Sequence, residues 1–377
     1  MKFDFDKVVD RHGTKCLKYD FAKERGRSDD MLPLWVADMD FQTAPGIQKS
    51  LSDAVAHGIY GYSEGKDDYF QAAAGWYEKH FGWKVEKEWL IKTPGVVFAL
   101  AMAVKAYTKE GDAVLLQQPV YYPFSEVITD NHRRLINSPL QQIDGHYEIN
   151  FEEFEQKIVE ENVKLFLMCS PHNPVGRVWK EWELRKIGDI CLKHNVLVVS
   201  DEIHSDFTYG ENIHHVFASL DEKYAAITTT CTAPSKTFNI AGLQISNIWI
   251  SNPELRARFR AEVTAAGYSQ VNLMGLVACQ AAYETGEEWL KELKTYLEGN
   301  LDYVRTFLKE NLPEIKLTEP EGTYLLWLDF KSLGMKEEQL KDLVENKAKL
   351  WLDSGAMFGP DGEGFERINI ACPREIL

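Results

Sequence analysis

The stretch TAPSKTFNIAG, residues 232–242, places a single lysine, Lys236, among small and apolar residues. It follows a short run, residues 226–230, that has the length and the threonine content of a strand. Burial lowers the pKa of a lysine and makes its neutral amine available as a nucleophile or a base. A lysine taken alone is far more often a solvated surface charge, so its interpretation depends on the surrounding sequence.

Four other short apolar runs are similar to the one before Lys236. Several of them are rich in valine or isoleucine, and stretches of helix length separate them. Runs that are apolar on both faces and alternate with helices predict a mostly parallel sheet covered on both sides. They are residues 113–116, 164–168, 196–200 and 245–250. The predicted fold class is therefore α/β, with ligands bound beyond the carboxyl ends of the strands.

The sequence changes character after residue 250. Helical periodicity extends from about residue 253 to residue 312, and strand-like runs return at residues 323–328 and 367–371. This tail is typical of a smaller α+β unit that follows a helical connection.

The length of 377 residues exceeds the size at which one hydrophobic core keeps growing. We therefore expect a large domain with a central sheet at residues 46–285 and a small α+β domain at residues 286–377. Residues 1–45 are expected to form an N-terminal arm that joins the small domain.

Composition excludes several classes of partner. A net charge of -16 argues against nucleic acid, because phosphate binding needs a basic face. The six cysteines show no C-x-x-C pair and no metal-ligand spacing, which indicates reduced thiols and no metal site. No apolar run reaches the roughly 20 residues of a membrane span, and the N-terminus lacks an apolar signal segment. We expect a soluble, cytoplasmic protein whose ligands are small molecules.

Polar residues also follow two of the other predicted strands. The loop CSPHNPVG, residues 169–176, holds Asn173 between two prolines, where a rigid turn can aim one side-chain amide. On this stretch alone, a plain turn is about as reasonable an interpretation. Asp201 follows the run 196–200, and a carboxylate buried there needs a cation opposite it. A helix cap is the other interpretation of Asp201.

These three residues together indicate a pyridoxal phosphate (PLP) site. In PLP enzymes an Asp keeps the pyridine nitrogen protonated and a Lys forms a Schiff base with the cofactor. The sequence resembles the fold-type I PLP enzymes, which have the aspartate-aminotransferase-like fold, and its motifs match Asn173, Asp201 and Lys236 in order. The resemblance implies PLP as cofactor and an amino acid as substrate. It also implies a cis peptide between Asn173 and Pro174, which aims the Asn173 amide at the cofactor.

The resemblance implies further contacts with the cofactor phosphate. The sequence TPGVV, residues 93–97, opens a helical run, and the amides at a helix N-terminus bind phosphate well. Val96 and Val97 are therefore expected to cradle the phosphate, and the hydroxyls of Ser235 and Thr232 to donate to it.

Two more residues match functional positions of the family. Tyr121 matches a catalytic position whose ring stacks on the cofactor, although packing against the core is an alternative. Arg367 resembles the arginine that grips the substrate carboxylate in a bidentate manner, with Asn173 beside it. A single arginine on a strand is usually a surface residue, and only its place in the series favours a role in binding.

Departures from the common aminotransferase pattern indicate one branch of the family. His204 replaces a frequent tyrosine three residues after the Asp, where it is expected to contact the cofactor, and Gln244 replaces a frequent arginine eight residues after the Lys. With WVADMDF at residues 35–41 and YGY at residues 60–62, the sequence resembles the MalY/PatB branch of cystathionine β-lyases. There Tyr62 reaches across a dimer interface to the neighbouring subunit's phosphate, which implies a homodimer.

The branch implies a PLP-dependent C–S β-lyase that cleaves L-cystathionine or related cysteine S-conjugates to a thiol, pyruvate and ammonia. An aminotransferase is the nearest alternative, because it shares the early steps of the reaction. A regulatory protein that keeps the fold is a weaker alternative, because the sequence has no DNA-binding extension and no basic patch.

Overall fold

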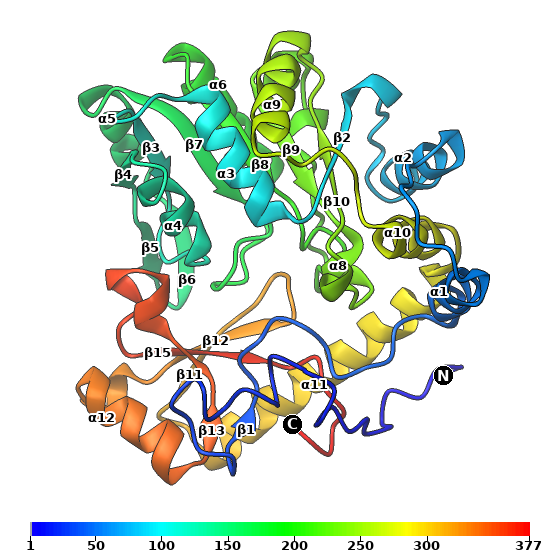
Figure 1. Cartoon of the computed structure of the whole chain (residues 1–377). Coiled ribbons are helices and arrows are strands. Elements are labelled where there is room, and N and C mark those ends of the chain that lie inside the picture. Colours follow the sequence, from blue (N-terminus) through cyan, green and yellow to red (C-terminus); the bar gives the residue numbers. More distant parts are fainter. Residues whose placement is uncertain (1) are drawn as a thin grey trace.

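A seven-stranded sheet forms the centre of the larger part of the protein (Figure 1), in a computed structural model that describes residues 2–377. The strand order is β2-β10-β9-β8-β7-β3-β4, and only β10 runs antiparallel to its two neighbours. The mostly parallel sheet predicted from the sequence is confirmed. The strands are β2 (Leu90–Thr93), β3 (Ala113–Leu116), β4 (Arg134–Asn137), β7 (Val163–Cys169), β8 (Leu197–Asp201), β9 (Thr228–Thr232) and β10 (Ser246–Trp249).

Helices cover both faces of this sheet. Consecutive side chains of a strand point to opposite faces, so a strand that is apolar throughout needs a covering layer on each side. In β3, Val114 and Leu116 pack in the core beneath α3, α4 and α9, whereas Leu115 packs in the core beneath α5 and α6. The covering helices are α3 (Val96–Tyr107), α4 (Pro123–Thr129) and α9 (Pro253–Ala265) on one face, and α5 (Phe151–Glu160), α6 (Glu181–Lys193) and α7 (Glu222–Ala225) on the other.

The five predicted runs are strands β3, β7, β8, β9 and β10, with small shifts at their ends. The run predicted at residues 226–230, for example, forms a strand at Thr228–Thr232. The edge strands β2 and β4 were not predicted. Each mixes charged and apolar residues and is partly exposed, so neither gives the continuous apolar signal of a central strand.

A second, antiparallel sheet has the order β11-β12-β15-β14. Its strands are β11 (Lys316–Thr318), β12 (Leu325–Asp329), β14 (Asp353–Ser354) and β15 (Phe365–Asn369). Two short pairs complete the strands, β1 (Leu32–Pro33) with β13 (Leu350–Trp351) and β5 (Leu140–Ile143) with β6 (His146–Ile149). The charged stretch before β13 forms α12 (Glu337–Lys341) and a π-helical turn (Asp342–Lys347).

The long helix α11 (Glu287–Asn311) extends from the larger part toward the small sheet (Figure 1). Helix α10 (Leu273–Thr285) packs against α1 (Pro45–His57), α2 (Asp67–Phe81) and α11. The N-terminal segment lies along the small sheet, where Leu32 N donates to Lys349 O at 2.7 Å and Asp40 N donates to Ala371 O at 2.9 Å. The domain boundaries at residues 45 and 285 stay a prediction.

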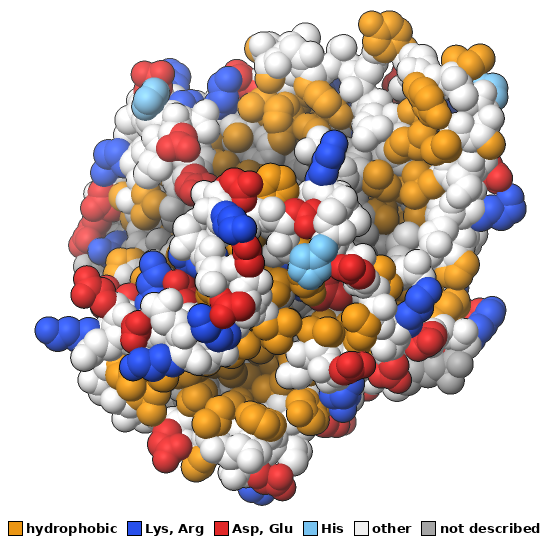
Figure 2. Space-filling view, turned by 60° about the horizontal axis from the view of Figure 1, so that its bottom comes forward, with side chains coloured by type: hydrophobic (Ala, Val, Ile, Leu, Met, Phe, Trp, Pro, Cys, Tyr) orange, Lys and Arg blue, Asp and Glu red, His pale blue; other side chains and the backbone are white. Residues whose placement is uncertain are grey.

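All six cysteines are free thiols; five are buried and Cys16 is half-buried. Within residues 2–377, no helix has both the length and the apolar character that crossing a membrane requires. On the face shown in Figure 2, acidic and basic side chains are interspersed around a hollow lined partly by hydrophobic side chains. That face has no continuous basic surface of the kind that nucleic acid needs.

Candidate active site

A cavity of about 410 Å³ lies beyond the carboxyl ends of the central strands. The register of the sheet places Cys169, Asp201 and Cys231 side by side at the ends of β7, β8 and β9. The loop after β7 and the helix after β9 then bring Asn173 and Lys236 into the wall of the same cavity. The cavity therefore lies where ligands are expected in a sheet of this kind.

Lys236 lies on the short helix α8 (Pro234–Thr237), which follows β9 directly. Its Nζ donates to the main-chain oxygen of Ala37 at 2.7 Å. Burial lowers the pKa of the Lys236 amine to about 8, although Asp38 opposes this effect. Near neutral pH a larger fraction of this amine is therefore unprotonated than of an ordinary lysine, and the unprotonated form is the one that acts as a nucleophile or a base.

Asp201 ends β8 with its side chain in the cavity wall and only 6% of the residue exposed. Ile203 N donates to its Oδ1 at 3.1 Å, and burial raises the pKa of the carboxyl to about 7. Within residues 2–377 the carboxylate has no ion-pair partner. A cationic ligand group beside Asp201 would compensate for the energetic cost of burying its charge.

The N-terminus of α3 opens onto the cavity. Val96 and Val97, its first residues, line the wall, and Gly95 before them supplies no side-chain cap. The amides of the first helical turn are free of side-chain acceptors and carry the positive end of the helix dipole. Ser235 also lines the cavity, so Val96, Val97 and Ser235, which are predicted to bind the phosphate, face the same cavity.

Arg367 links the loop after β7 to the small sheet. It extends from β15, and its Nη1 donates to Oδ1 of Asn173 at 3.0 Å. Its Nη2 pairs with the buried carboxylate of Asp353 and also donates to Trp35 O at 3.0 Å. Since Arg367 occupies Oδ1 of Asn173, the amide nitrogen Nδ2 remains as a donor. The peptide between Asn173 and Pro174 is cis, which confirms the prediction.

Tyr121, His204 and Gln244 complete the predicted part of the wall. Burial raises the pKa of the Tyr121 hydroxyl and lowers that of the His204 imidazole well below its usual value. Nδ1 of His204 is buried without a hydrogen-bond partner among the described residues. His204 is thus a neutral ring with an unsatisfied polar atom at the cavity.

Three predicted residues do not line this cavity: Arg367, which contacts the cavity residue Asn173, and Thr232 and Tyr62. Thr232 is fully buried within the central sheet, where its hydroxyl donates to Asn247 O at 2.8 Å and accepts from Trp249 Nε1 at 3.0 Å. The antiparallel partner strand β10 therefore uses the hydroxyl that was expected at the phosphate. Tyr62 is 93% exposed and lines an adjoining surface groove.

The structure adds three groups that sequence reasoning did not assign. The Ala37 carbonyl contacts Lys236, Tyr324 donates its hydroxyl to that same carbonyl at 3.0 Å, and Asp353 holds Arg367. Ala37 lies inside WVADMDF, a string noticed only as a mark of a family branch. Nothing in the sequence around Asp353 or Tyr324 distinguishes either from an ordinary strand residue.

These groups fit one kind of ligand. An unpaired buried carboxylate suits a protonated ring nitrogen, and an uncapped helix N-terminus suits a phosphate. An amine with a lowered pKa suits an aldehyde carbon. Within residues 2–377 no cluster of His, Cys, Asp or Glu is arranged to hold a metal ion. The fold and the cavity therefore define a site of the kind that binds PLP.

Comparison with known proteins identifies the family. Residues 30–376 match the family described as aminotransferase class I and II. Cystathionine beta-lyase PatB of Bacillus subtilis (strain 168) is 44% identical over 369 residues, which cover 98% of this chain and 95% of the relative. The chain belongs to the aminotransferase class I and II family, so the family predicted from the sequence is confirmed.

Two solved structures confirm the predicted fold class. Cystalysin of Treponema denticola, which contains a pyridoxal 5'-phosphate cofactor, is 39% identical with a TM-score of 0.96, covering 100% of this chain and 96% of its own. The PLP-bound C–S lyase of Staphylococcus hominis is 34% identical with a TM-score of 0.93, covering 100% of this chain and 95% of its own.

Proposed function

We propose that this protein is a PLP-dependent C–S β-lyase that cleaves L-cystathionine or a related cysteine S-conjugate to a thiol, pyruvate and ammonia. The observation that carries the proposal is the meeting of Lys236, Asp201 and the N-terminus of α3 in one cavity. The names of the relatives, cystathionine beta-lyase and C–S lyase, support this reaction over others of the family.

When bound, PLP supplies an aldehyde carbon for the substrate amine and a pyridinium ring that withdraws electrons from Cα. Lys236 supplies a base, because the lowered pKa of its amine leaves Nζ able to take the Cα proton near neutral pH. Asp201 would hold a proton on the ring nitrogen, because its buried carboxylate makes no ion pair with any residue in the described range 2–377.

The remaining residues of the cavity would hold the cofactor and orient it. The amides of Val96 and Val97 and the hydroxyl of Ser235 bind the phosphate. Tyr121 would contact the cofactor ring, and His204 and Nδ2 of Asn173 would offer polar atoms to it, because all three residues line the cavity. These side chains wall the cavity and exclude water from the reacting atoms.

Arg367 binds the substrate carboxylate. Asp353 and the Trp35 carbonyl hold Nη2 of the guanidinium, and Nε is buried without a partner among the described residues. Nε and the second hydrogen of Nη1 remain as donors for the substrate carboxylate, and a guanidinium that is already oriented loses little side-chain entropy on binding.

The reaction is tested by the release of thiol. The purified, PLP-loaded protein is incubated with L-cystathionine, and thiol and pyruvate are measured over time. We expect both to form in equal amounts, because breaking the bond from Cβ to sulfur yields one of each. Absence of thiol from L-cystathionine and from other cysteine S-conjugates would contradict the proposed function.

We further propose that the active unit is a homodimer. Tyr62 follows two other exposed hydrophobic residues, Ile59 and Tyr60. These tyrosines line a groove that shares Pro94 and Gln244 with the active-site cavity. A second copy packed on this groove would bring its own Tyr62 to the phosphate end of the cavity.

We also propose that the protein is located in the cytoplasm.

Tyr62→Ala is expected to weaken PLP binding by about ten- to hundredfold without unfolding the chain, because the side chain is exposed in a single copy and one hydrogen bond to a charged group contributes about 1.5–3 kcal/mol. The dissociation constant is measured by fluorescence titration, and the oligomeric state by sedimentation. Tyr303→Ala on α11, another exposed aromatic, is the control and should leave the dissociation constant unchanged. A monomer with full PLP affinity would contradict the dimer.

A further inference from the structure

The Ala37 carbonyl oxygen accepts two hydrogen bonds at the active site. Lys236 donates to it through Nζ at 2.7 Å, and Tyr324 donates through its hydroxyl at 3.0 Å. Ala37 lies in the N-terminal segment 35–41, which contacts both the small sheet and the residues on and after α8, the helix that carries Lys236. The direction in which this carbonyl points therefore determines where the free Lys236 amine rests.

Asn369 holds the backbone on both sides of Ala37. Its side-chain Nδ2 donates to Val36 O and to Asp38 O, each at 2.6 Å. Asn369 is itself fixed, because Ala371 N donates to its Oδ1 at 2.8 Å and only 1% of the residue is exposed. With both neighbouring carbonyls turned toward Asn369, the Ala37 carbonyl between them is left to face Lys236.

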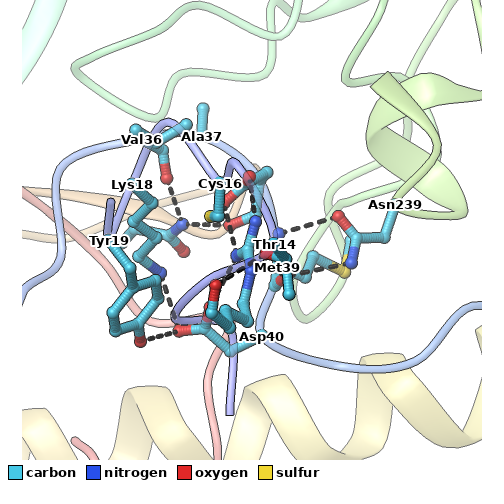
Figure 3. A network of polar contacts seen from close by, with 12 residues as sticks. Thr14, Cys16, Lys18, Tyr19, Val36, Ala37, Met39, Asp40 and Asn239 are labelled. Carbon is cyan, nitrogen blue, oxygen red and sulfur yellow. Dashed lines mark hydrogen bonds and ion pairs between the residues drawn. The ribbon is translucent and has the colours of Figure 1, made fainter. Parts of the chain in front are cut away.

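Other anchors hold segment 35–41 farther from Ala37 (Figure 3). Asp40 accepts from Lys18 Nζ at 2.7 Å and from the Tyr19 hydroxyl at 3.1 Å. Asn239, in the loop after Lys236, accepts from Met39 N at 2.9 Å and donates to Met39 O at 2.9 Å. These contacts keep the segment in place, but among the described residues only Asn369 contacts the carbonyls on both sides of Ala37.

We propose that Asn369 is a positioning residue for the catalytic amine: by holding the carbonyls of Val36 and Asp38 it aims the Ala37 carbonyl at Nζ of Lys236. This inference rests on the proposed function of Lys236 as the base. An N–H of the neutral amine that donates to a fixed acceptor limits the directions in which the nitrogen lone pair can point. The carbonyl also accepts from the protonated amine, and this stronger bond opposes the effect of burial on its pKa.

The test compares two buried asparagines. Asn369→Leu removes both donated bonds with little change in volume. Asn300→Leu is the matched control, because Asn300 is fully buried and donates through Nδ2 to two main-chain oxygens, Ile370 O at 2.7 Å and Cys372 O at 2.9 Å. Neither bond of Asn300 touches segment 35–41.

The first readout needs no cofactor. The full chain is stripped of PLP and labelled with trace acetic anhydride across a pH series, and the extent of acetylation of Lys236 is read by peptide mass spectrometry. Asn369→Leu is expected to lower the pH midpoint of labelling by about half a unit or more, because the acceptor that favours the ammonium form is displaced. The charged groups that act on Nζ, namely Asp38, Asp201 and Arg367, are unchanged in both variants.

The second readout uses the PLP-loaded enzyme. Asn369→Leu is expected to lower kcat by about tenfold while KM changes less than about twofold, because the base is misplaced but Arg367 still binds the substrate. Asn300→Leu should change neither value. Equal midpoints in Asn369→Leu and the parent chain, or equal shifts in both leucine variants, would overturn the proposal.

Tyr324→Phe provides an independent test if Asn369→Leu does not fold. It removes the competing donor to the Ala37 carbonyl, so Lys236 binds this oxygen more strongly and its labelling midpoint is expected to rise. An unchanged or lowered midpoint would count against the carbonyl as the acceptor. Failure of the parent enzyme to release thiol would instead refute the proposed function, and the labelling results on the cofactor-free chain would be unaffected.

Discussion

Lys236→Ala is expected to abolish covalent attachment of PLP and to lower kcat for thiol release by about 10³-fold or more, because the variant loses both the covalent link and a positioned base. The parent enzyme should be yellow, and borohydride should fix the cofactor to the chain. The variant should bind PLP only reversibly, through the contacts of Asp201 and the N-terminus of α3.

A second lysine provides the control for this result. Lys294 on α11 is partly buried, and burial lowers its pKa as it does for Lys236, but it lies outside the active-site cavity. Lys294→Ala should keep the colour and the turnover. Peptide mapping after borohydride treatment should find the cofactor on Lys236, and its presence on any other lysine would show that the site is wrongly assigned.

Asp201→Asn is expected to lower kcat for β-elimination by about 10²-fold or more while PLP stays bound, because the amide keeps the shape of the carboxylate but not its charge. Without that charge the ring nitrogen is not held protonated. Lys236 and the phosphate contacts at Val96, Val97 and Ser235 remain. Near-normal turnover in Asp201→Asn would return Asp201 to the role of a structural carboxylate.

In the cofactor-free chain, Asp201→Asn should increase the stability of the fold, although it lowers kcat in the PLP-loaded enzyme. Burial raises the pKa of Asp201 to about 7, so the folded chain binds this proton more tightly than the unfolded chain does. The contribution of Asp201 to stability is therefore fully present below about pH 4, the usual carboxyl pKa, and is lost as the pH rises toward 7. At pH 8, cofactor-free Asp201→Asn should be more stable than the parent by about 1–3 kcal/mol. A lower melting temperature for the variant at pH 8 would contradict this account.

The central sheet was predictable because its inner strands are buried on both faces. Strands β7 and β8 are nearly continuous apolar runs, and their ends deliver Asn173 and Asp201 to one edge. The edge strand β4 is exposed along part of its length, and its apolar and polar residues do not alternate regularly. Its pairing depends on a neighbour that one stretch of sequence does not reveal.

The part of the active site that lies just after the strands was predictable for the same reason. Lys236, Asp201 and Asn173 follow predicted strands, so the topology of a parallel sheet brings them together. Thr232 was expected at the phosphate because it precedes Lys236, but it is the last residue of β9 and its hydroxyl bonds across to β10. Ala37 and Asp353 come from distant segments that meet only through the small sheet, and no local pattern predicts such a contact.

Under the proposed function, the chain eliminates a thiol and does not transfer an amino group. The most direct measurement follows pyruvate and thiol from L-cystathionine with the PLP-loaded enzyme, once without a keto acid and once with an excess of one. We predict the same initial rate of both products in the two reactions and a steady turnover when no keto acid is present. Strict dependence of turnover on the keto acid, with no thiol released, would contradict the account and identify an aminotransferase.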